Sequence, residues 1–162
     1  MPDRLPAQQV ERFLRGRHVA IVTTLNSDGT ALQTPVWYLY RDGVLYVRTN
    51  SQSAKIRNIR RDPRVSVCIQ DEGPPYRGVT VTGRARVEPD RPELSSAMSR
   101  NYLGAIAGFF YLRLRTKDQI EDDPDTILVI EPNGRHGWDY RPQTPLVGRI
   151  WLALKHVLPP WL

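Results

Sequence analysis

The sequence has little of the residues that usually carry metal or covalent chemistry. It contains one cysteine, Cys68, so no internal disulfide can form. Cys68 lies in the apolar run VSVCIQ, and we expect it to be buried in the core. The three histidines, His18, His136 and His156, are far apart in the chain, and we expect them to have structural or surface roles. No metal-site spacing or catalytic triad is recognisable, so no metal is expected.

Long apolar segments are also missing. The N-terminal stretch MPDRLPAQQVERFL lacks the apolar region of a signal peptide. No apolar run approaches the roughly 18 residues that a membrane span needs. We therefore expect a cytoplasmic protein. Its 162 residues, 40% hydrophobic and 25% charged, are typical of one soluble globular domain.

Positive charge is in excess, with a formal net charge of +6. This balance favours anionic partners such as phosphates, acidic ligands, nucleic acid or an anionic membrane, without choosing among them. The charge is concentrated in VRTNSQSAKIRNIRRDP, residues 47–63, which holds five cations: Arg48, Lys55, Arg57, Arg60 and Arg61.

Local patterns predict a mainly β or α+β fold with a small barrel-like antiparallel sheet. The turn signals NSDGT and RDG separate the first three strands into a meander. Gly83 in mid-strand predicts a bulge or bend. Strands are predicted at 18–25, 31–40, 44–50, 64–70, 77–88, 126–132 and 135–140, helices at 5–16 and 53–61, helical structure within 90–116, and an acidic loop at 118–125.

The helix predicted at 53–61 has two possible roles. Ile56 and Ile59 form its core side, and Lys55 lies at the rim of that buried stripe. Ser51 or Ser53 can cap the helix start, which presents free N–H groups and partial positive charge. With the hydroxyls of Thr49, Ser51 and Ser53, this is the chemistry of a phosphate site. The alternative is a capped amphipathic helix with a solvated basic face.

The stretch QTPVW, residues 33–37, precedes this helix in the chain. Pro35 cannot donate a hydrogen bond within a sheet, which implies an edge strand or a bulge. Trp37 offers a broad flat surface for stacking or packing. A planar ring lying along this strand would place its phosphate at the start of the helix. The alternative is a core tryptophan beside a bulged edge.

The order of these parts resembles the split-barrel flavin family that includes pyridoxamine phosphate oxidases. It is most similar to the deazaflavin (coenzyme F420)-dependent reductases of that superfamily. The resemblance runs from about Arg17 to Val87 and rests on TTLNSDGTALQTPVWY, VLYVRTNSQSAKIRNIRRDPRVSV and YRGVTVTGRARVE. It implies an antiparallel split β-barrel of the FMN-binding type, with six or seven strands and short helices. It also implies a homodimer with the cofactor at the subunit interface.

The resemblance implies roles for individual residues. The phosphate would be held by Thr49, Ser53, Ala54 and Lys55, and the ring system by Gln33, Thr34, Pro35, Val36 and Trp37. The partner chain would close the site with residues around Tyr76–Gly78, including Arg77, and with Trp138. Arg57, Asn58, Arg60 and Arg61 would meet the acidic tail of the deazaflavin. A donor for developing negative charge would come from Tyr38, Tyr76 or Arg77.

Two departures from the family bear on the cofactor. FMN-using oxidases carry cations on the strand where this chain has LQTPVWYLY, and their C-terminal arginine and histidine pattern is not recognisable, since Arg135-His136 is only a superficial echo. We therefore expect an F420-dependent reductase that delivers a hydride to a conjugated or quinone-like acceptor. The alternatives are an FMN-binding oxidoreductase and a non-catalytic binder. The non-catalytic binder would take flavin-type ligands, or nucleic acid through the basic helix with broad, weak and steeply salt-dependent binding. No nucleic-acid partner is expected.

The last segment, TPLVGRIWLALKHVLPPWL, has apolar residues at helical spacing. We assign residues 1–143 to the barrel domain and 144–162 to an amphipathic tail of the same domain, packed across it or across the dimer partner. The alternative is a monotopic membrane helix. Pro159-Pro160 limits the helix to about three turns, which is short for firm membrane binding.

Overall fold

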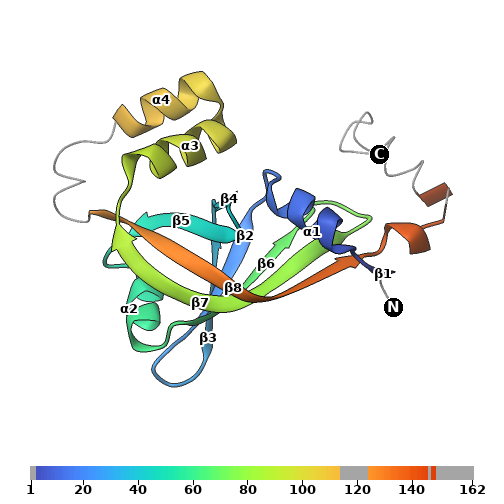
Figure 1. Ribbon diagram of the computed structural model, residues 1–162, viewed down its shortest axis with the longest axis horizontal. Helices are drawn as coiled ribbons and strands as arrows, with labels where there is room; N and C mark the ends of the chain where they lie inside the picture. The colour runs from blue at the N-terminus through green and yellow to red at the C-terminus, as the bar shows by residue number, and fades with distance from the viewer. Residues whose placement is uncertain (1–2, 114–123, 146, 149–162) are drawn as a thin grey trace, which may run out of the picture.

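One antiparallel sheet of eight strands forms the body of residues 3–113, 124–145 and 147–148, which the computed structural model describes (Figure 1). The strand order is β3-β2-β6-β7-β8-β5-β4, and β1 pairs with β8. The sheet curves like a split barrel but does not close, because β3 and β4 are at opposite ends of this order. The strands are β1 (Asp3–Arg4), β2 (Ala20–Leu25), β3 (Ala31–Val36), β4 (Leu39–Arg41), β5 (Val44–Asn50), β6 (Arg64–Gln70), β7 (Arg77–Pro89) and β8 (Asp125–Asp139).

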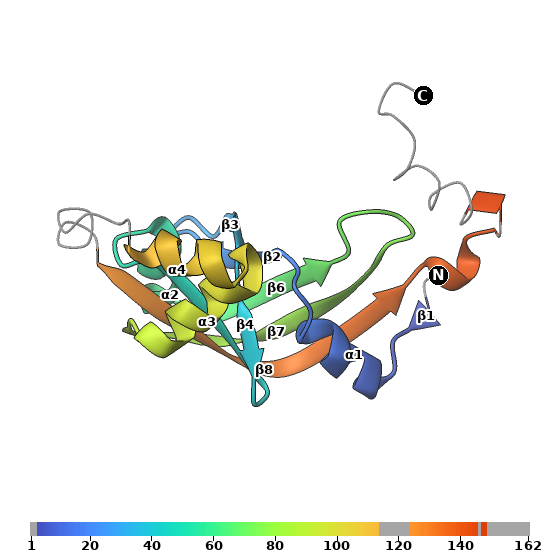
Figure 2. The same cartoon turned by 90° about the horizontal axis from the view of Figure 1, so that it is seen from above.

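Short helices cover the sheet. They are α1 (Ala7–Leu14), α2 (Ala54–Arg61), α3 (Pro92–Leu103), α4 (Ala105–Arg113) and the 3₁₀ helix η1 (Arg141–Gln143). α3 and α4 pack on each other and lie together above the β4–β5 end of the sheet, whereas α1 lies beside β7 and β8 (Figures 1 and 2). The predicted mainly β split barrel with short helices is confirmed, but the sheet has eight strands where six or seven were predicted, because the short β1 and β4 are strands of their own. None of the helices in the described ranges has the length and apolar character that crossing a membrane demands.

The prediction of one continuous strand at 31–40 is wrong. The chain leaves the sheet after Val36 and re-enters at Leu39, so that β3 pairs with β2 while β4 pairs with β5. The predicted meander therefore breaks at Trp37 and Tyr38, and β5 finds its second partner in β8. Pro35 lies on β3, at an end of the strand order, which confirms the predicted edge strand.

The prediction of two separate strands at 126–132 and 135–140 is also wrong. β8 runs unbroken through Asn133-Gly134 because the long β7 pairs with it on both sides of that dipeptide. The extra residue is accommodated by a register shift between Thr82 and Gly83, which confirms the predicted bulge. A Cβ at Gly83 would lie 2.3 Å from the Glu131 carbonyl oxygen, so the close approach of these strands requires glycine there.

The substitution Gly83→Ala is expected to lower the free energy of unfolding by about 1–3 kcal/mol, since a methyl group must push β8 away. Urea denaturation of the purified protein measures this. Gly73→Ala is the matched control, because nothing lies within 4 Å of a Cβ at Gly73. Equal stability of the two variants would contradict the close packing of β7 on β8.

The main core lies between the sheet and helices α1 and α2. Val65, Val67 and Ile69 of β6 point into it, together with Ile56 and Ile59 of α2. Cys68 is half-buried and lies on the opposite face of β6, so its prediction as a core residue is wrong. The reason is the two-residue period of a strand, which alternates faces even within an apolar run.

Two further predictions lie mostly outside the described residues. Residues 118–123 of the acidic loop and nearly all of the tail at 144–162 are not described, so the tail's role stays a prediction. Asp125, the last residue of the predicted loop, is the first residue of β8 and pairs with Asn50.

Candidate functional site

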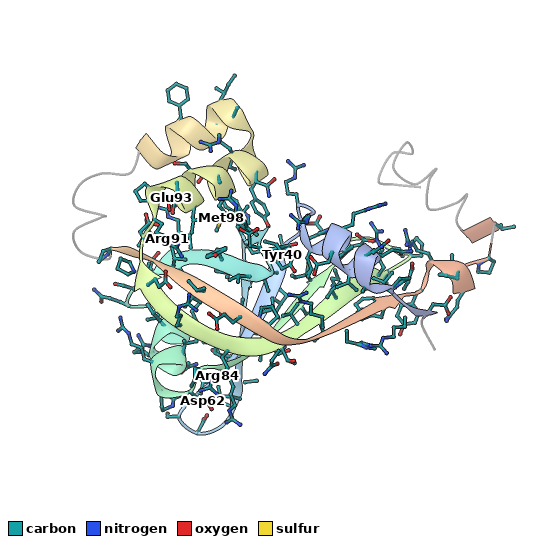
Figure 3. The ribbon with its side chains drawn as sticks, viewed as in Figure 1. Tyr40, Asp62, Arg84, Arg91, Glu93 and Met98 are labelled. Carbon is teal, nitrogen blue, oxygen red and sulfur yellow. The ribbon has the colours of Figure 1, made fainter. Side chains whose placement is uncertain are left out.

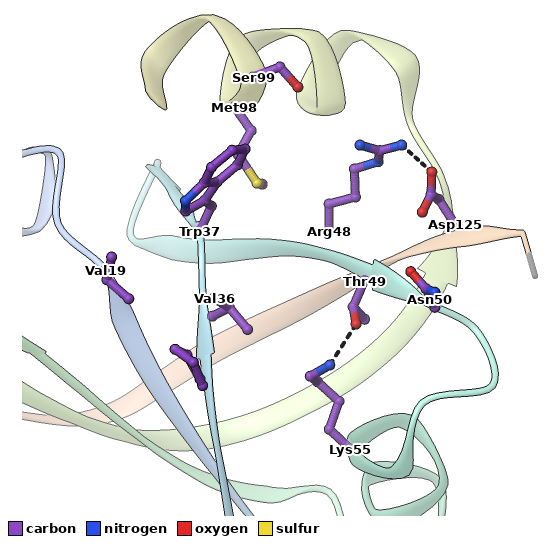
Figure 4. A pocket seen from close by; sticks show the side chains of 11 residues that line it. Val19, Val36, Trp37, Arg48, Thr49, Asn50, Lys55, Met98, Ser99 and Asp125 are labelled. Carbon is purple, nitrogen blue, oxygen red and sulfur yellow. Dashed lines mark hydrogen bonds and ion pairs between the residues drawn. The ribbon is translucent and has the colours of Figure 1, made fainter. Parts of the chain in front are cut away.

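A pocket of about 550 Å³ opens where the chain leaves the sheet between β3 and β4. Its walls come from this connection and the end of β3, from the end of β5, from the start of α2 and from the side of α3 that faces the sheet, where Met98 lies (Figures 3 and 4). The pocket therefore brings together segments spread over most of the chain. It is lined by Val19, Pro35, Val36, Trp37, Arg48, Thr49, Asn50, Lys55, Met98, Ser99 and Asp125.

One end of the pocket carries a positive charge without a neutralising carboxylate. Lys55 donates from Nζ to Thr49 Oγ1 at 2.8 Å (Figure 4). Within the described residues, no carboxylate lies within ion-pair distance of Lys55. Partial burial lowers the pKa of Lys55 from its usual value, because it disfavours the charged form. A bound anion would offset this desolvation, so this end of the pocket suits an anionic group.

Ser53 and Ala54, which precede Lys55 at the start of α2, do not line the pocket themselves. Ser53 is the N-cap residue of α2, as predicted, but its side chain makes no capping hydrogen bond. Its Oγ is buried and has no hydrogen-bond partner. A buried hydroxyl without a partner is costly unless a ligand completes it. Thr49, Ser53 and Lys55 therefore gather at the start of α2, where the helix dipole also favours negative charge.

Three other polar residues of α2 make hydrogen bonds within the fold. Arg57 donates to the carbonyl oxygen of Gln52 at 2.6 Å, and Arg61 donates to that of Leu25. Asn58 is buried, and its amide donates to Thr24 Oγ1 at 3.1 Å and to Asn26 Oδ1 at 2.9 Å. The bonds of Asn58 and Arg61 tie α2 to the end of β2 and to the β2–β3 turn. Asn58 and Arg60, predicted to meet the cofactor tail, do not line the pocket.

An apolar wall adjoins the Lys55 end of the pocket. Pro35, Val36 and Trp37 form it, with Met98 of α3 above them. The Trp37 indole stacks on the Tyr102 ring with centroids 5.0 Å apart and an interplanar angle of 8°. The Tyr102 hydroxyl donates to the carbonyl oxygen of His18 at 2.5 Å and accepts from the backbone N–H of Tyr38 at 3.2 Å. Tyr102, fixed by these two hydrogen bonds, thus packs against Trp37.

The opposite end of the pocket holds an ion pair that sequence reasoning missed. Arg48 of β5 pairs with Asp125 at the start of β8, and their side chains are only 14% and 11% exposed. Arg48 Nε is buried and has no hydrogen-bond partner. Arg48 could have been noticed as the one cation within the apolar strand VLYVRT. Asp125 could not, because strand pairing brings it there from 77 residues away.

Several predicted site residues lie outside the pocket. Gln33 and Thr34 are on β3 but do not line the pocket. Tyr38 is buried in the core, where its hydroxyl donates to the carbonyl oxygen of Gly16 at 3.2 Å. Burial raises the pKa of Tyr38 far above its usual range. Tyr38 is therefore badly placed to donate a proton or a hydrogen bond to a ligand in the pocket.

Tyr76, Arg77 and Trp138 form a separate cluster where β7 begins and its pairing partner β8 ends. Gly78 pairs with Trp138, and Tyr140 donates its backbone N–H to the Tyr76 carbonyl oxygen at 2.9 Å. Arg77 donates to Asp71 at 2.6 Å. None of them lines the pocket of the same chain. Their contribution to a partner's site stays a prediction.

The chain belongs to the pyridoxamine 5'-phosphate oxidase family, whose profile matches residues 6–139. This places it among the flavin-type oxidoreductases of the split-barrel superfamily. No curated protein matches the chain. Within the described residues, no group of three or more histidine, cysteine, aspartate or glutamate side chains could hold a metal ion.

Solved structures share the fold. A conserved hypothetical protein of Mycobacterium tuberculosis is 23% identical, with a TM-score of 0.62 over 85% of this chain and 86% of that one. An FAD-binding protein of Mesorhizobium loti is 22% identical, with a TM-score of 0.61 over 85% and 96%. An F420 reductase is 24% identical, with a TM-score of 0.59 over 81% and 98%.

Proposed function

We propose that this protein is a coenzyme F420 (deazaflavin)-dependent reductase that transfers a hydride to a conjugated or quinone-like small-molecule acceptor. The observation that carries the proposal is that an unneutralised Lys55, hydrogen-bonded to Thr49, and an apolar wall at Pro35–Trp37 line the same pocket. A phosphate at the first and a planar ring along the second fit this arrangement. The pocket volume of about 550 Å³ lies within the usual range for small-molecule sites.

The choice of deazaflavin over FMN rests on the wall beside the ring. Residues 31–40 contain no lysine or arginine, and the part of them that lines the pocket is Pro35, Val36 and Trp37. The similarity to a solved F420 reductase supports the same choice. The FAD-binding protein of Mesorhizobium loti favours the second candidate, an FMN-type oxidoreductase.

The chain's own residues would bind the cofactor, orient its ring and shield it from water. When bound, a reduced deazaflavin supplies the hydride itself. Lys55, Thr49 and Ser53 would hold the phosphate and anchor the ring against Val36 and Trp37. Met98 on α3 would cover the ring and exclude water. A homodimer would bring the cluster at Tyr76, Arg77 and Trp138 of one chain to the pocket of the other and offer the acceptor its hydrogen-bond donors.

Titration with the deazaflavin cofactor and, separately, with FMN tests the proposal. Trp37 lies in the pocket wall, so tryptophan fluorescence should be quenched on binding. We expect tighter binding of the deazaflavin, followed by acceptor-dependent oxidation of the reduced cofactor under anaerobic conditions. Tighter binding of FMN would select the second candidate. Deazaflavin binding without turnover on a panel of quinones and enones would indicate a non-catalytic binder.

Cofactor affinity is expected to fall as pH rises through the pKa of Lys55, which burial has lowered from its usual 10.5. A phosphate binds the protonated amine, so each binding event at high pH must take up a proton. Without cofactor, the unfolded chain holds the Lys55 proton more tightly than the folded protein does. The free energy of unfolding of the cofactor-free protein therefore rises with pH between the lowered pKa of Lys55 in the folded state and its ordinary pKa in the unfolded state. Titrations between pH 7 and 10 measure the effect, and Lys55→Arg should abolish the dependence in that range.

A further inference from the structure

The pocket has two polar ends of different charge. At one end Lys55 is a cation without a carboxylate partner among the described residues. At the other end Arg48 is already paired with Asp125, so this corner is neutral overall (Figure 4). The side chains of Arg48 and Asp125 meet on the α3 side of β5, whereas those of Lys55 and Thr49 meet on the other side of that strand. Both ends line one continuous pocket.

This difference predicts what each end binds. An anion at the Arg48 corner would have to compete with Asp125 for the same guanidinium, while Lys55 offers an unshared charge. A neutral group that contains both a carbonyl and an N–H suits the corner better, because arginine is a pure donor and aspartate a pure acceptor. A carboxylate accepts several hydrogen bonds at once, so the existing pair does not prevent this. The buried, unpartnered Nε of Arg48 shows that its donors are not fully used.

We propose that Arg48 and Asp125 form a subsite for the imide edge, O=C–NH–C=O, of a planar heterocycle whose phosphate is held by Lys55. Arg48 donates to an imide carbonyl, and Asp125 accepts from the imide N–H. The apolar residues Val36, Trp37 and Met98 contact the ring between the two ends. This inference rests on the proposed function, but it does not depend on the choice of cofactor, since flavins and deazaflavins share this edge.

Methylation of the imide nitrogen tests the subsite, because it removes the N–H donor and leaves the phosphate and the ring unchanged. Dissociation constants are measured for the deazaflavin cofactor and FMN and for their N3-methyl derivatives. We expect wild-type protein to bind the N3-methyl form about 10-fold more weakly or worse, because the methyl group replaces the N–H that Asp125 would accept and crowds the subsite. The double variant Arg48→Met/Asp125→Leu should bind the parent more weakly and no longer distinguish it from the methylated form.

Lys55→Ala is the matched control within the same pocket. It should weaken the parent and the methylated ligand by the same factor and keep their ratio, because Lys55 acts at the phosphate. Equal affinity of wild-type protein for both forms would overturn the subsite and leave the proposed function standing. So would a double variant that still discriminates between them. If no flavin or deazaflavin binds, the proposed function fails, and the inference fails with it.

Discussion

Replacing Lys55 by alanine is expected to lower the affinity for the phosphorylated deazaflavin by about 100-fold. A charge-assisted hydrogen bond to an ionised group contributes about 1.5–3 kcal/mol, and removing it from a partly buried site loses most of that. The loss should be large because Lys55 is the only cation at this end of the pocket among the residues that the structure describes. Arg57 and Arg61 of α2 are bonded to backbone carbonyls. The dissociation constant comes from quenching of tryptophan fluorescence.

The matched control is Arg60→Ala, which removes the same charge from the same helix at an exposed position. We expect the Arg60 variant to change the affinity by less than about 3-fold, since exposed charges are screened by water and salt. The melting temperatures of both variants should stay close to that of the wild type. Equal losses of affinity in the two variants would show that α2 attracts the cofactor by its overall charge and that Lys55 makes no specific contact.

The substitution Asp125→Leu is expected to lower the free energy of unfolding by about 3–5 kcal/mol. It leaves the Arg48 guanidinium, only 14% exposed, without its ion partner between β5 and β8. An uncompensated buried charge is strongly destabilising, whereas replacing both partners of such a pair by apolar residues is often close to neutral. The double variant Arg48→Met/Asp125→Leu should therefore recover most of the lost stability. Urea denaturation of the wild type, the single variant and the double variant measures the cycle.

An exposed ion pair on the same strand gives the comparison. Glu131 of β8 pairs with Arg86, and both side chains are more than half exposed. Glu131→Leu is expected to change the free energy of unfolding by less than about 1 kcal/mol, as is usual for surface pairs. A double variant at Arg48 and Asp125 that is as unstable as Asp125→Leu would show that the pair, with its particular geometry, is needed for folding.

Much of the fold was predictable because its signals are local. Alternating side chains placed β6 and β7 within a residue or two of their true ends. Asp28-Gly29 marked a real turn, in which Gly29 has a φ of 83°. Gly83 marked a real bulge and Pro35 a real edge strand. Each of these depends on steric rules that act within a few residues of the chain.

The errors arose where strand pairing is decided by distant residues. The 31–40 segment reads as one strand, yet it contributes to both ends of the sheet because β5 pairs with β8 and not with β3. Asn133-Gly134 reads as a turn, yet β8 continues because β7 is long enough to pair with it throughout. Local patterns contain no information on which strand will lie alongside.

The candidate site also combines features that local sequence determines with features that depend on strand pairing. By itself the sequence determined the class of the protein and the position of a basic helix with Lys55 at the rim of its buried stripe, since helical period and motif order are properties of the chain. Only the tertiary structure decided which cations of 47–63 face the pocket, with Lys55 free to bind an anion and Arg48 neutralised by Asp125. The physical reason is that pairing of β5 with β8 sets this contact, and strand pairing depends on the whole sheet.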